Sequence, residues 1–283
     1  MEVKLTAEDC ASFDTHGMLV LKDFYSIREE ILPIQKAIYE LLGCIIQRHA
    51  LDICRAPFDG DTFDDGFMDL VKKNRTYGGE VYDTVKMLPS FIRLFSGRKH
   101  QQLFETLRGG ALTGISLPSQ GIRIDLPNED RFRAFWHQEF LYQPQSQDGI
   151  IFWAPLVPIS PEIGPLQICP GSQKEGLLKY RKTSRDPTLP NAFSIEVKNP
   201  QETVDRYPAV APLVEPGDLL VMDFLTLHQS GTNRSQRARW SMQMRCFNFL
   251  EPIGAKLGWP ASITAGTDVE SIFSEYIEHE ESQ

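Results

Sequence analysis

The sequence is poor in cysteine and in long apolar runs, and both shortages narrow what the chain can be. Its five cysteines are scattered without CxxC spacing, and an odd number favours reduced thiols over a disulfide framework. No stretch approaches the length of a membrane span, and the N-terminus has no apolar run of the signal-peptide kind. We therefore expect a soluble, cytoplasmic protein with structural cysteines.

Positive charge is also scarce. The 29 Lys and Arg residues are outnumbered by 38 Asp and Glu residues, which gives a net charge of −9. This balance argues against nucleic acid or an anionic membrane as the main partner. The simplest interpretation of the excess acidic residues is a solvated acidic surface.

The texture of the sequence changes along its 283 residues. Residues 1–110 have mainly helical patterns, whereas residues 111–250 consist of short β-type runs separated by Pro and Gly, which is typical of a sandwich or jelly roll. Residues 251–283 carry one helical pattern, at 269–277, and an acidic tail. We predict a single domain of mainly β (α+β) class: a double-stranded β-helix, or jelly-roll, cupin-like barrel, flanked by N-terminal helices.

Local signals place the helices. Thr6 and Asp9 match a capping box that opens a short helix. A second helix is predicted from Ser26 to about residue 49; Pro33 interrupts its apolar period, so the helix either kinks or begins there. Further helices are predicted within 67–108 and end at a Gly-Gly pair.

Short β-type runs place the strands. The predicted strands are 18–22, 111–117, 120–126, 133–137, 149–157, 165–169, 211–214, 218–223 and 239–249. The polar connection 174–210 is too long for an ordinary turn and is a candidate lid. Its locally basic patch predicts either a solvated lid or a contact with an anionic group of a substrate. The patch consists of Lys174, Lys179, Arg181, Lys182 and Arg185.

Two histidines and one glutamate form a candidate metal site. A His-x-Glu pair alone is weak, because six histidines and 38 acidic residues give about 0.8 His-x-acid pairs by chance. Strand alternation, however, places His137 and Glu139 on one face, and His228 follows an apolar strand pattern that can bring a third ligand. Two imidazoles and one carboxylate on one face of a metal leave positions open for substrates, as in oxygen-activating iron enzymes.

The final predicted strand offers a second, independent pattern. One face is apolar, and the other is polar and carries Arg237, Arg239, Ser241, Gln243 and Arg245. Because barrels of this type hold their site inside, the arginine-rich face is predicted to point inward, where a guanidinium can clamp a carboxylate bidentately. A dicarboxylic co-substrate needs such a clamp.

At these residues the chain resembles the phytanoyl-CoA dioxygenase-like branch of the iron(II)/2-oxoglutarate-dependent oxygenases. The resemblance covers most of residues 5–250. The matching motifs are Trp136-His-Gln-Glu139, Trp153-Ala-Pro-Leu156, Gly164-Pro-Leu-Gln-Ile-Cys-Pro-Gly-Ser172, Pro216-Gly-Asp-Leu-Leu-Val-Met-Asp223, and His228-x-Ser230 with Asn233 and Arg239.

The resemblance implies a set of roles. It makes His137, Glu139 and His228 ligands of Fe(II), with 2-oxoglutarate as co-substrate and O2 as oxidant. It makes Arg239, eleven residues after His228, the partner of the far carboxylate of 2-oxoglutarate. Ser230 and Ser241 are candidates to assist, and Arg123 either contacts co-substrate or substrate or forms an ion pair with Asp125. The implied activity is hydroxylation, or a related oxidation, of a small molecule with release of succinate and CO2.

Two positions depart from the family pattern. Glu139 stands where the family usually has Asp, and Gln173 stands where it usually has His. Glutamate adds one methylene but remains a hard oxygen ligand, so we expect iron binding to persist. An acidic residue here also argues against a halogenase, whose pattern vacates this position.

Two other classes of function fit part of the pattern. A cupin-like metal binder or zinc hydrolase could use the same His/Glu/His face without dioxygen. A catalytically silent barrel could be retained for partner binding. Succinate release that needs iron(II) and 2-oxoglutarate favours the oxygenase, whereas an unaltered function in His228→Ala favours the silent barrel.

Overall fold

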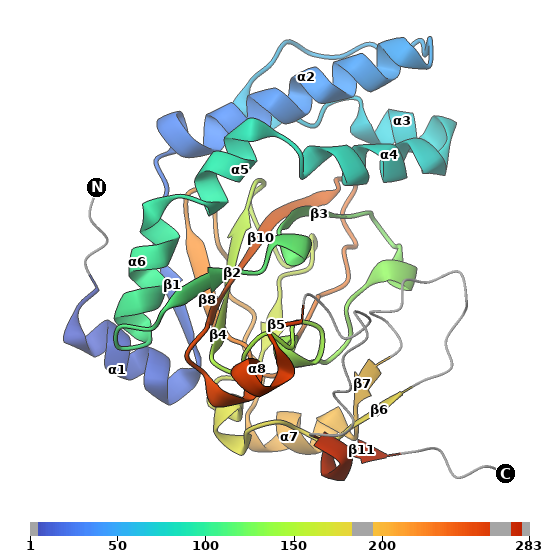
Figure 1. Ribbon diagram of the computed structural model, residues 1–283. Helices are drawn as coiled ribbons and strands as arrows, with labels where there is room; N and C mark the ends of the chain where they lie inside the picture. Colours follow the sequence, from blue (N-terminus) through green and yellow to red (C-terminus); the bar gives the residue numbers. More distant parts are fainter. Residues whose placement is uncertain (1–4, 183–194, 261–272, 279–283) are drawn as a thin grey trace, which may run out of the picture.

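The centre of the computed structural model, which describes residues 5–182, 195–260 and 273–278, is an antiparallel sheet. Its neighbouring strands run in the order β1, β8, β4, β10 and β2, and β3 also pairs with β10 (Figure 1). The strand bounds are β1 Met18–Leu21, β2 Thr113–Ile115, β3 Gly121–Asp125, β4 Gly149–Pro155, β8 Leu219–Asp223 and β10 Arg239–Asn248. The predicted jelly-roll class is confirmed.

A smaller antiparallel sheet supplies the second layer. Strand β5 (Gln167–Ile168) pairs with β9 (His228–Gln229). Isolated bridges extend this pair on both sides, from His137 to His228 and from Ile168 to Val210. One ligand-bearing segment is therefore held to the other by backbone hydrogen bonds.

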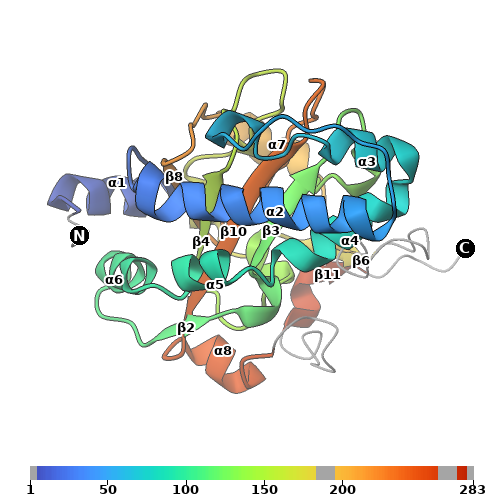
Figure 2. The ribbon, with the colours of Figure 1, turned by 90° about the horizontal axis from the view of Figure 1, so that it is seen from above.

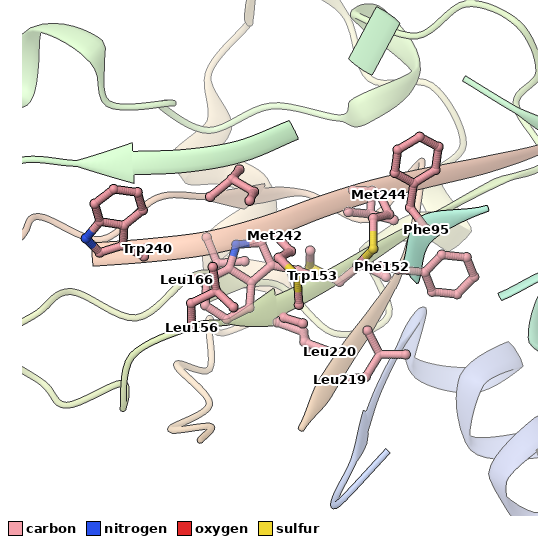
Figure 3. Close-up of a cluster of buried hydrophobic side chains, with 14 of the residues drawn as sticks. Phe95, Phe152, Trp153, Leu156, Leu166, Leu219, Leu220, Trp240, Met242 and Met244 are labelled. Carbon is pink, nitrogen blue, oxygen red and sulfur yellow. The ribbon is translucent and has the colours of Figure 1, made fainter. Parts of the chain in front are cut away.

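Strand β10 has the two faces that its sequence predicts. Trp240, Met242 and Met244 are buried in the hydrophobic core, and Met244 lies beside Phe152 of β4 (Figure 3). The Trp240 indole donates to Asp64 Oδ2 at 3.0 Å, so its N–H is satisfied in the core. The alternating polar residues lie on the opposite face of the strand.

The N-terminal helices cover the large sheet, with α2 running across it (Figure 2). Their side chains enter its core: Gln35 Nε2 donates to Leu156 O at 2.9 Å, and the rings of His100 and Phe152 lie 5.1 Å apart. The helix bounds are α1 Ala7–His16, α2 Leu32–Arg48, α3 Phe67–Lys73, α4 Arg75–Val85, α5 Pro89–Phe95 and α6 Arg98–Leu107.

Local chemistry explains where the first two helices begin and end. Thr6 and Asp9 form the predicted capping box of α1, and the left-handed Gly17 (φ 64°) ends that helix. A π-helical turn, η1 Ile27–Ile31, precedes α2, so Pro33 lies in the first turn of α2, where its missing N–H costs no hydrogen bond. The helix begins at the proline rather than kinking there.

Two predicted strands are absent from the described chain. Residues 133–137 make one bridge and are flanked by 3₁₀ turns, η4 Asp130–Phe132 and η5 Glu139–Leu141. Residues 211–214 include Pro212, which cannot donate to a ladder, although Val214 O accepts from Ile159 N at 3.0 Å. The first segment makes three backbone hydrogen bonds to 228–230 and the second makes one to Ile159, and neither forms a strand.

The predicted lid has secondary structure where it is described. It contains a 3₁₀ turn, two short strands that pair with each other, and a helix. The elements are η6 Ser172–Glu175, β6 Tyr180–Lys182, β7 Ile195–Val197 and α7 Pro200–Arg206. Arg181 pairs with Glu196 at 3.2 Å, which fits the solvated alternative for this part of the basic patch. Arg185 lies outside the described residues.

The C-terminal region differs in part from its prediction. Helix α8 spans Pro252–Leu257. Of the pattern at 269–277, the described part forms a 3₁₀ turn, Ser274–Tyr276, and strand β11, Ile277–Glu278, which pairs with β6. Pairing with β6 replaces the expected helix there. Across the residues that the structure describes, no helix has the length and apolarity needed to cross a membrane.

Candidate metal centre

Backbone pairing brings the candidate ligands together. His137 N donates to His228 O at 2.9 Å, and His228 N donates to His137 O at 3.1 Å. Gln138 between the first two ligands is extended, so His137 and Glu139 lie on one side, as the strand pattern predicts. The two side chains share a side because of one extended residue and one β-bridge, not because the segment is a full strand.

Gln138 anchors this segment from the other side. It is fully buried, and its Nε2 donates to the carbonyls of Gly176 and Leu225 at 2.8 and 2.7 Å. Its Oε1 accepts from Leu178 N at 2.8 Å. No local pattern predicts this role, because all three partners of the amide are backbone groups from distant segments.

The three ligand atoms converge at metal-binding spacing. One atom each from His137, Glu139 and His228 lie within 4.8 Å of one another, and all three residues are buried. Glu139 Oε2 is 3.9 Å from Nε2 of each histidine. Such spacing is too long for hydrogen bonds and fits three ligands around one ion.

The histidine tautomers suit a metal. His137 Nδ1 bonds to Phe135 O at 2.6 Å and His228 Nδ1 to Thr226 O at 2.9 Å. Since a carbonyl only accepts, each Nδ1 carries the proton and each Nε2 presents its lone pair to the centre. The arrangement is that of imidazoles oriented by backbone carbonyls for coordination.

Electrostatics holds the centre in its metal-binding protonation state. Burial, with repulsion from His228, lowers the pKa of His137 to about 3, and burial lowers the pKa of His228. Burial alone would raise the pKa of Glu139, but Arg245 and the two histidines outweigh it and lower that pKa. Neutral imidazoles and an ionised carboxylate are the forms that bind a cation.

Arg245 of β10 holds the other oxygen of Glu139. Its Nε donates to Glu139 Oε1 at 2.6 Å, while its terminal nitrogens donate to Ser119 O and Gln243 Oε1. The glutamate therefore divides its oxygens, with Oε1 on the guanidinium and Oε2 facing the histidines. The sequence places Arg245 on the same polar face as Arg239 but carries no local signal of this pairing, which joins residues 106 positions apart.

A cavity of about 360 Å³, here called the metal cavity, opens onto the three ligands. Among the predicted residues, Ser230 and Arg123 also line it, together with Arg245. Arg123 donates to Asp125 Oδ1 at 2.8 Å. Both of its sequence-based alternatives thus have a structural counterpart: an ion pair and a position on the cavity wall.

Arg239 and Ser241 lie deeper. The Arg239 side chain is 1% exposed and is absent from the lining of the metal cavity. It donates twice to Asp125 Oδ2, at 3.2 and 2.9 Å, and to the carbonyls of Gly164 and Gly231. Among the described residues, these bonds use four of its five N–H groups and leave one on Nη2. Ser241 Oγ is buried and, within the described residues, has no hydrogen-bond partner.

Solved structures similar to this chain share its fold. EctD from S. alaskensis with bound Fe has a TM-score of 0.56 at 18% identity, covering 88% of this chain and 80% of its own. The carbocyclase SnoK from nogalamycin biosynthesis has a TM-score of 0.53 at 16% identity, and the match covers 87% of this chain and 85% of SnoK. EvdO2 from Micromonospora carbonacea var. aurantiaca, complexed with 2-oxoglutarate, has a TM-score of 0.52 at 19% identity, and the match covers 88% of this chain and 94% of EvdO2.

Family comparison covers most of the sequence. No curated protein matches the chain. The sequence model of the phytanoyl-CoA dioxygenase (PhyH) family matches residues 13–241, a span that includes all three ligand residues and Arg239. The chain therefore belongs to the phytanoyl-CoA dioxygenase family of oxygenases.

Proposed function

We propose that the protein is a non-haem iron(II)- and 2-oxoglutarate-dependent dioxygenase that hydroxylates a small molecule. The observation that carries the proposal is the convergence of His137, Glu139 and His228, with both Nε2 lone pairs and one carboxylate oxygen directed at one point on a cavity wall. Three ligands on one face leave coordination positions for other molecules. Family membership and the shared fold support an oxygenase.

The residues of this chain have separable tasks. His137, Glu139 and His228 would hold Fe(II), and Arg245 keeps Glu139 Oε1 away from it. The chemistry supplied by bound iron with 2-oxoglutarate and O2 is oxidation of the substrate, coupled to decarboxylation of 2-oxoglutarate to succinate. The protein orients the reactants and limits water around them.

The co-substrate groups fit 2-oxoglutarate with one modification of the predicted clamp. Within the described part of the chain, the buried Ser241 Oγ, two positions from Arg239, has no partner, and Arg239 has one N–H left. Together they can take one end of a carboxylate, with Ser230 and Arg123 nearer the metal cavity. Because Arg239 already donates two hydrogen bonds to Asp125, we propose that Arg239 and Ser241 together contact the carboxylate, in place of a bidentate clamp by Arg239 alone.

The neighbours with known ligands suggest the class of substrate. One EctD structure contains 2-oxoglutarate and 5-hydroxyectoine, and SnoK is described as a carbocyclase. The fold therefore accompanies small-molecule oxidations with different outcomes. For this chain, hydroxylation of a small molecule is the proposal.

The test is succinate formation. Protein loaded anaerobically with iron(II) and 2-oxoglutarate is exposed to air with a panel of small molecules, and succinate is quantified. Stimulation that requires both iron(II) and 2-oxoglutarate supports the proposal. Turnover supported by zinc without 2-oxoglutarate would instead make the protein a hydrolase that uses the same three ligands.

A further inference from the structure

A second cavity lies beside the metal cavity, between helix α4 and strand β3. It has a volume of about 290 Å³ and is here called the α4 cavity. Apolar parts of its wall come from Phe67 of α3, Tyr82 of α4, and Leu126 and Phe132 after β3. Helix α4 packs against β3, so two rigid elements define the space.

The two cavities adjoin. Tyr82 and Arg123 line both of them. Arg123 is fixed in this shared wall, since it donates to Asp125 Oδ1 at 2.8 Å and to Phe132 O at 2.5 Å. Tyr82, by contrast, is 45% exposed, although it is a large aromatic residue. The two cavities therefore share a wall made by one fixed side chain, Arg123, and one exposed side chain, Tyr82.

Two consecutive glycines in α4 have different explanations. A Cβ added at Gly78 would lie 2.9 Å from Val71 Cγ2, so the packing of α3 on α4 requires a glycine. A Cβ added at Gly79 would meet nothing within 4 Å. Glycine inside a helix costs about 1 kcal/mol relative to alanine. No packing contact accounts for that cost at Gly79, but Gly79 lines the α4 cavity and leaves it open.

The charged residues that line the α4 cavity are engaged in ion pairs. Arg75 donates to both oxygens of Glu129, at 2.9 and 2.8 Å, and Asp125 accepts from Arg123. Asp83, which also lines the cavity, pairs with Lys86 at 3.2 Å. The uncharged part of the wall offers aromatic and aliphatic surface. A volume near the lower limit of ligand pockets suits a group the size of one or two rings.

We propose that the α4 cavity is the part of the substrate site that takes a compact, uncharged aromatic or apolar group, while the reacting carbon lies in the metal cavity. This inference rests on the proposed function. It gives the substrate two parts: a ring-sized apolar group next to Gly79, and a polar reacting end beside the ligands.

The experiment uses fluorobenzene as the probe and follows its ¹⁹F NMR signal with the full-length protein. We expect saturable binding to the wild type and weaker binding to Gly79→Ala, because its one methyl group fills a small part of the cavity. Gly79→Phe places a ring in the cavity and should weaken binding at least about tenfold. If Gly79→Phe does not fold by circular dichroism, Gly79→Leu replaces it. No binding to the wild type, or equal binding by the Ala and Phe variants, overturns the proposal.

A metal-dependent measurement separates this inference from the proposed function. With Mn(II) in the metal centre, bound fluorobenzene should relax faster than with Zn(II), because the two cavities adjoin. Metal binding is checked independently by electron paramagnetic resonance. If Mn(II) binds and relaxation does not change, the α4 cavity is not part of the substrate site. If Mn(II) does not bind, the proposed function fails, and the Gly79 variants still decide whether the cavity takes a ring.

Discussion

Arg245→Met should destabilise the metal-free protein much more than the metal-loaded protein. Arg245 and Glu139 form a buried ion pair, with side chains 11% and 4% exposed. Removing one partner of such a pair leaves a buried carboxylate uncompensated, which costs about 3–5 kcal/mol. With an unfolding entropy of about 2.1 cal/mol/K per residue, a chain of this size should lose about 5–8 °C in Tm.

A divalent cation changes this result, because it neutralises Glu139 from the other oxygen. With saturating Mn(II) we expect the loss of Tm to fall to about half or less, so the metal should stabilise the variant more than the wild type. Differential scanning calorimetry with and without Mn(II) measures both values.

The matched control is Arg237→Met, two residues before β10. Arg237 pairs with Asp64, at 3.0 and 2.7 Å, away from the ligands. Arg237→Met should change Tm by the same amount with and without metal, whether that change is large or small. The reasoning is refuted if Arg245→Met changes the Tm of the metal-free protein by less than about 1 °C, or if metal leaves its loss unchanged.

Three further predictions test other parts of the account. Glu139→Gln should abolish iron-dependent succinate formation while the fold is retained by circular dichroism; surviving activity would show that the ligand assignment is wrong. Burial lowers the pKa of His100 to about 4 from 6.5, so the unfolded state binds more protons between these values, and stability should fall by about 3 kcal/mol from pH 7 to 4. Urea unfolding at several pH values measures how the free energy of unfolding changes with pH. This change should be smaller for His100→Gln than for the wild type, and an equal change in both would contradict the low pKa of His100. Asp125→Asn should free Arg239 and tighten 2-oxoglutarate binding about five- to tenfold in calorimetric titrations; weaker binding would mean that Asp125 positions Arg239 instead of competing for it.

Local patterns predicted the elements that carry strong periodicity. The alternation along β10 correctly separated Trp240, Met242 and Met244, which enter the core, from Gln243 and Arg245, which line the metal cavity. The capping box of α1 was also evident. These features depend on residues that are close in sequence.

Long-range pairings limited the prediction of the candidate site. The register that sets Arg239 opposite Asp125 arises only when β10 pairs with β3, and the bond from Arg245 to Glu139 joins residues 106 positions apart. The sequence therefore predicted Arg245 on the inward face but not its carboxylate partner. Arg237, predicted on the same face, lies before β10 and pairs with Asp64, which also accepts from the Trp240 indole. The segment that carries His137 was predicted as a strand. A single extended residue, Gln138, places its two neighbours on one side just as the two-residue period of a strand does, so the sequence pattern does not distinguish the two.

The most direct measurement of the central claim is succinate production by the wild type and Glu139→Gln, each loaded anaerobically with iron(II) and 2-oxoglutarate and then exposed to air with the substrate panel. The account predicts succinate from the wild type only when iron(II), 2-oxoglutarate and O2 are all present, and none above background from the variant. Equal succinate from both proteins, or wild-type turnover that proceeds with zinc and without 2-oxoglutarate, would contradict it.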